Sequence, residues 1–126
     1  MKKDMLDINK LAGFIAQNGL SFVAAMDAAT MAVGKTSLIN GWHDDAPSME
    51  PAKSYYKAGK LALIHSEVSE ALEEIRLGQD EDEEIADVII RCMDYCFEND
   101  IAIGNKIIEK MMQNVTREYR HGGKKL

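Results

Sequence analysis

Apolar positions recur with a helical period along most of the chain. In residues 60–76 and 83–98 they return every three or four positions, which places them on one face of each helix. Strand-like alternation is nearly absent, and both prolines fall in one expected loop, residues 44–51. The pattern therefore predicts an all-α protein, an antiparallel bundle of four to five helices.

Glycine and capping signals divide this pattern into segments. Asn18-Gly19 predicts a break, after which Ser21 would cap the next helix. Gly78 opens a short turn that would join two long helices as a hairpin. The helices are expected at residues 7–18, 21–39, 53–77, 82–98 and 102–118. A chain of 126 residues is expected to form one domain, 1–126.

Each helix of the expected hairpin carries an apolar face and a separate row of acids. In the first helix the core face is expected at Leu61, Ile64, Val68, Ala71, Leu72 and Ile75, with Glu67, Glu70 and Glu74 off that face. In the second it is expected at Ile85, Val88, Ile89, Cys92, Met93 and Cys96. Cys92 and Cys96 are accordingly expected as buried, reduced thiols.

Two acidic doublets stand out within these rows: Glu67-x-x-Glu70 and Glu84-x-x-Asp87. A spacing of three puts both carboxylates of a doublet on one helix face, one turn apart. On neighbouring antiparallel helices the four groups would point at one place, where a cation offsets their repulsion. Oxygen ligands favour Mg²⁺, with Mn²⁺ as the expected substitute. The alternative is an ordinary solvated acidic face.

Charge is unevenly distributed along the chain, whose net charge is −6. Residues 65–100 are strongly acidic and residues 101–126 are basic. The overall sign argues against a nucleic-acid polymer as partner, whereas acids beside bases suit a metal–polyphosphate site. No signal peptide is recognised, and the apolar stretch 20–33 is short and interrupted by Asp27. We therefore expect a cytoplasmic protein without a membrane span.

Three segments together resemble a known family. The first is Leu61-Ala-Leu-Ile-His-Ser-Glu-Val-Ser-Glu-Ala-Leu-Glu-Glu-Ile-Arg76, and the second is Glu84-Ile-Ala-Asp-Val-Ile-Ile-Arg91. The third comprises Glu109-Lys110-Met111, Asn114, Arg117 and His121-Gly122-Gly123-Lys124-Lys125. In this order they resemble the MazG-like all-α nucleoside triphosphate pyrophosphohydrolases, whose signature is an ExxE helix followed by an ExxD helix. The resemblance covers about residues 41–126.

This resemblance implies a Mg²⁺-dependent enzyme that hydrolyses a nucleoside triphosphate to the monophosphate and pyrophosphate. It implies metal ligands at Glu67, Glu70, Glu84 and Asp87, with Glu67 and Glu70 also catalytic. It makes Lys110, Asn114 and Arg117 candidates for phosphate or sugar contacts. Subunit bundles in the family imply a homodimer or homotetramer.

Two positions leave the chemistry open. Many members carry a glutamate that can serve as general base where this chain has Ser66, so Glu67 or another carboxylate is the expected substitute. Trp42, the only tryptophan, either stacks on a nucleobase or fills space between helix ends. The alternatives for the whole chain are a pyrophosphatase specific for dUTP or dCTP, and a non-catalytic acidic helical interaction protein.

Overall fold

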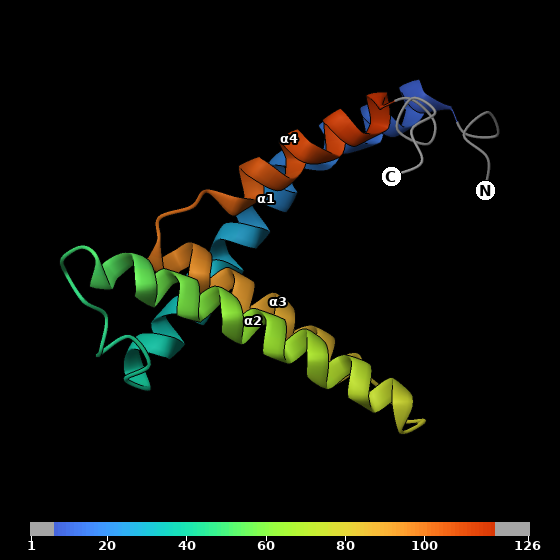
Figure 1. Cartoon of the computed structure of the whole chain (residues 1–126). Helices are drawn as coiled ribbons and strands as arrows, with labels where there is room; N and C mark the ends of the chain where they lie inside the picture. Colours follow the sequence, from blue (N-terminus) through green and yellow to red (C-terminus); the bar gives the residue numbers. More distant parts are fainter. Residues whose placement is uncertain (1–6, 118–126) are drawn as a thin grey trace. The chain divides into compact units, whose positions relative to one another are not determined.

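The computed structural model describes residues 7–117, and the regular structure in this part of the chain is entirely helical. The four helices are α1 (Ile8–Ile39), α2 (Ala52–Arg76), α3 (Asp82–Glu98) and α4 (Ile103–Thr116) (Figure 1). The all-α prediction is confirmed. The bounds of α2, α3 and α4 agree with the expected ones to within two residues.

The predicted break at Asn18-Gly19 is wrong, because α1 continues through it as one helix of 32 residues. The side chains that signalled a cap bond back to the helix instead. Asn18 Nδ2 donates to the carbonyl oxygen of Phe14, and Ser21 Oγ donates to that of Asn18. Gly19 is buried, and a Cβ there would only touch the Ile108 side chain at 3.8 Å.

The described residues divide into two compact units, of which Ala29–Ile101 is one and the residues on either side of it, within 7–117, form the other. In the flanking unit α4 packs on the first part of α1 (Figure 1). A Cβ at Gly104 would lie 3.2 Å from the Cα of Val23, so this glycine allows the two backbones to approach closely.

The unit Ala29–Ile101 is built around the hairpin of α2 and α3, which run antiparallel side by side (Figure 1). The last turns of α1 belong to the same unit. Gly34 is buried there, and a Cβ on it would overlap the ring of Phe97 on α3. Glycine at this position is therefore what allows α1 to lie against α3.

The expected division of α2 into a core face and an acidic row is wrong in part. Glu67 is 7% exposed and Ala71 is 5% exposed, so an acid shares the buried face. The apolar side chains Leu61, Val68, Leu72 and Ile75 are 45–60% exposed. The cause is that Glu67 pairs with an arginine of α3, while the described residues leave most of the apolar face uncovered. On α3, Cys96 is buried as expected but Cys92 is exposed.

Among the helices of residues 7–117, α1 is long and apolar enough to cross a membrane by length and composition. The core helix of a soluble protein can pass the same test.

Candidate functional site

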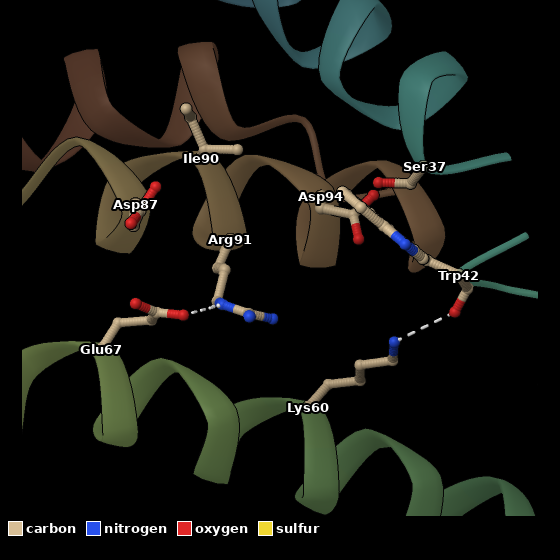
Figure 2. A pocket seen from close by; sticks show the side chains of 8 residues that line it. All are labelled: Ser37, Trp42, Lys60, Glu67, Asp87, Ile90, Arg91 and Asp94. Atoms are coloured by element: carbon tan, nitrogen blue, oxygen red, sulfur yellow. Dashed lines mark hydrogen bonds and ion pairs between the residues drawn. The ribbon is translucent and has the colours of Figure 1, made fainter. Parts of the chain in front are cut away.

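A pocket of about 330 Å³ lies in the unit Ala29–Ile101, between α2 and α3 and the loop that follows α1 (Figure 2). Its lining residues are Ser37, Trp42, Lys60, Glu67, Asp87, Ile90, Arg91 and Asp94. Two expected metal ligands and the only tryptophan of the chain therefore share one pocket with two basic side chains. This combination offers groups for a cation, for phosphate oxygens and for an aromatic ring.

Glu67 and Arg91 form an ion pair across the hairpin. The guanidinium Nε of Arg91 donates to Glu67 Oε1 at 2.5 Å (Figure 2). The Glu67 side chain is 10% exposed, so the arginine supplies the positive charge that a buried carboxylate requires. Arg91 therefore occupies one of the two oxygens of the Glu67 carboxylate.

Among the four carboxylates predicted as metal ligands, Glu70 is affected by the charges of the other three. The charge of Glu67 raises the pKa of Glu70 above its ordinary value, and a hydrogen bond between the two groups adds to this. Burial and the charges of Glu84 and Asp87 raise it further. Within residues 7–117, no three acids, histidines or cysteines are arranged as ligands around one point. The doublets are thus close enough to repel one another, while Glu67 is turned to Arg91.

Trp42 lies on the loop between α1 and α2 and is 60% exposed at the side of the pocket (Figure 2). Its backbone carbonyl accepts a hydrogen bond from Lys60 Nζ at 3.3 Å. The same lysine lies over the ring of Tyr56, 5.1 Å from its centroid. Lys60 therefore connects the tryptophan loop to α2 and carries its positive charge into the pocket.

Ser66 is expected to contribute little to catalysis. Its hydroxyl donates to the carbonyl of Leu63 in the preceding turn, at 2.7 Å, and no activating base among residues 7–117 is bonded to it. We expect Ser66→Ala to retain kcat within about tenfold, since one hydrogen bond of about 0.5–1.5 kcal/mol is lost. Glu67→Gln should lose several orders of magnitude. Both are measured at saturating Mg²⁺ and substrate; equal losses would place the serine in the chemistry.

The predicted substrate contacts of the C-terminal segment belong to the flanking unit. Lys110 and Asn114 lie on α4, and Arg117 directly follows it. Lys110 Nζ donates to Gln113 Oε1 of the next turn. Their contact with phosphate or sugar stays a prediction. His121 and the basic tail around it lie outside the described residues.

Sequence reasoning did not single out Lys60 and Arg91 as functional residues. The spacing along each helix pointed to both residues. Lys60 precedes Glu67 by seven positions, and Arg91 follows Asp87 by four. Each spacing keeps two side chains on one helix face. A lysine or arginine on the same helix face as a candidate metal ligand is therefore itself a candidate site residue.

A comparison of the chain with protein-family models, curated proteins and solved structures finds no match in any of the three.

Proposed function

We propose that the chain is a Mg²⁺-dependent nucleoside triphosphate pyrophosphohydrolase, which releases a nucleoside monophosphate and pyrophosphate. The observation that carries the proposal is the pocket between α2 and α3, where Glu67 and Asp87 lie together with Trp42, Lys60 and Arg91. The expected role is control of the (deoxy)nucleotide pool or removal of aberrant nucleotides. The resemblance to MazG-like enzymes supports the same assignment.

The donor set suits a hard divalent cation, because it consists of carboxylate oxygens alone. Their mutual repulsion, seen in the raised pKa of Glu70, is what a bound cation would relieve. Glu67, Glu70, Glu84 and Asp87 would hold it. When bound, Mg²⁺ would neutralise phosphate charge and make water a better nucleophile at neutral pH.

The other pocket residues bind and orient the substrate in this proposal. Arg91, released from Glu67, and Lys60 would pair with phosphate oxygens, since guanidinium and ammonium groups donate strong charge-assisted hydrogen bonds to them. Trp42 would stack on the base. Glu67 or Glu70 would accept the proton of the attacking water. Lys110, Asn114 and Arg117 remain expected phosphate or sugar contacts.

The test is a panel of (d)NTPs incubated with Mg²⁺, with the products separated by chromatography. We expect monophosphate and pyrophosphate in equal amounts and no turnover in excess EDTA. Diphosphate and orthophosphate as products would contradict the proposal. Turnover of dUTP or dCTP alone would favour the base-specific alternative.

A binding measurement separates the enzyme from a non-catalytic interaction protein. A ligand that binds only the folded state raises its melting temperature. Mg²⁺ and a triphosphate together should therefore stabilise the chain more than either alone. No stabilisation and no turnover would favour the interaction protein.

A further inference from the structure

A buried polar network joins the tryptophan loop to α3, outside the carboxylate cluster. His43 Nε2 donates to Asp94 and lies 3.0 Å from both of its carboxylate oxygens. His43 Nδ1 lies 3.9 Å from Glu98 Oε2, to which the hydroxyl of Tyr56 donates at 2.6 Å. The imidazole side chain is only 8% exposed, and it stacks on the ring of Phe97 with centroids 6.3 Å apart.

Through this network His43 connects the loop to the hairpin by largely buried contacts. Burial raises the pKa of Tyr56, and the Glu98 carboxylate raises it further, so the phenol stays a donor. Glu98 Oε1 is buried without a hydrogen-bond partner within the described part of the chain. Losing His43 would leave Asp94 as a second poorly satisfied carboxylate, because a part-buried carboxylate needs a donor.

The residue next to His43 is held by three helices of one unit. The backbone N–H of Trp42 donates to the carbonyl of Ser37 at the end of α1, at 3.0 Å. Its carbonyl accepts from Lys60 of α2, and its neighbour His43 is bonded to Asp94 of α3. The hydrogen bond between Lys60 and the Trp42 carbonyl is exposed to solvent, whereas the His43–Asp94 pair is largely buried. The His43–Asp94 pair therefore supplies a connection between the loop and α3 that is shielded from water.

We propose that His43 is a positioning residue that holds Trp42 at the pocket, where the indole stacks on the base of a nucleotide. Asp94 links the two roles, since it accepts from His43 and also lines the pocket. The indole itself is mostly exposed and so remains free to stack. The stacking step rests on the proposed function, whereas the restraint of Trp42 by His43 does not.

The restraint is tested without any substrate, because Trp42 is the only tryptophan and its fluorescence reports on the loop alone. We expect acrylamide to quench His43→Ala more strongly than the parent protein. His43→Gln keeps a donor for Asp94 and should restore part of the difference. Ser48→Ala, in the same loop and exposed, is the matched control.

Circular dichroism checks that each variant is folded. Equal quenching in the parent and folded His43→Ala would overturn the restraint.

The stacking role is tested by kinetics with Mg²⁺ and the preferred triphosphate. We expect His43→Ala to raise KM about tenfold, in the range of a lost base–aromatic contact, with a much smaller change in kcat. If His43 acts only through Trp42, the double variant Trp42→Ala/His43→Ala should have the KM of Trp42→Ala alone. Effects on KM that multiply, or a loss confined to kcat, would overturn the positioning role.

The two measurements separate this inference from the proposed function. Stronger quenching of His43→Ala in a protein that hydrolyses no triphosphate would support the restraint while contradicting both the enzyme and the stacking step. Unchanged quenching in an active pyrophosphohydrolase would contradict the restraint while leaving the enzyme in place.

Discussion

Glu70→Gln and Asp87→Asn are each expected to lower kcat by far more than a hundredfold while leaving the fold intact. Loss of a group that merely supports a metal ligand typically costs about 10–100-fold, and these variants would remove a ligand itself. Each also removes one charge from a repelling cluster. In EDTA the variants should therefore melt at the same temperature as the parent or higher. Activity is measured over a Mg²⁺ titration, and stability by differential scanning calorimetry.

A matched control for Glu70→Gln comes from the same helix, α2. Glu73 is exposed, pairs with Arg76 one turn away and lies outside the pocket. Glu73→Gln changes the net charge by the same amount, and as a surface substitution it should alter kcat by no more than about twofold. Near-parental turnover of Glu70→Gln or Asp87→Asn at limiting Mg²⁺ would contradict the four-carboxylate site. Equal losses in the control would trace the effect to overall charge.

The protein is expected to assemble from at least two copies through the apolar face of the hairpin. Leu61, Val68, Leu72 and Ile75 lie on one face of α2 at spacings of seven, four and three, and all are 45–60% exposed. On α3, Ile85 and Ile89 are exposed to a similar degree. A row of exposed apolar side chains along one helix face is typical of a surface that a partner covers. A second copy with the same face would cover it, as the resemblance to MazG-like enzymes also implies.

Substitution within this face should dissociate the assembly. Leu72→Glu would bury a carboxylate in an apolar interface from each copy, so we expect the dissociation constant to rise at least about a hundredfold. Light scattering should give a multiple of the 14.0 kDa chain mass for the parent and that mass for the variant. Met49→Glu is the control, because Met49 is 74% exposed on the loop before α2. A parent that is monomeric and active at micromolar concentration would refute the assembly.

The sequence alone was sufficient to predict the bounds of the helices from residue 52 onward. Periodic apolar residues, Gly78 and the acidic first turn of α3 act within a few positions of one another, so the bounds of α2 and α3 follow from local rules. The same locality explains the error in α1. Asn18-Gly19 resembles a helix end, but the bonds that Asn18 and Ser21 make to preceding carbonyls satisfy them inside a helix.

The spacing of the acidic doublets was enough to predict that Glu70 of α2 lies near the acids of α3, because two helices joined by a short turn must run side by side. Their identity as metal ligands is still a proposal. What spacing could not reveal is the partner of each group. Only the packing of α2 on α3 decided that Glu67 would be buried against Arg91, 24 positions away.

The pocket around these acids depended most on tertiary structure. His43 and Asp94 are separated by 51 positions, and Lys60 lies 18 positions from the Trp42 carbonyl it binds. No helical or turn period relates such residues, so their contact follows only from how a loop is laid across two packed helices. Local sequence therefore determined where the helices and their acidic residues lie. Long-range packing decided that Lys60, Arg91 and the indole of Trp42 lie beside those acids.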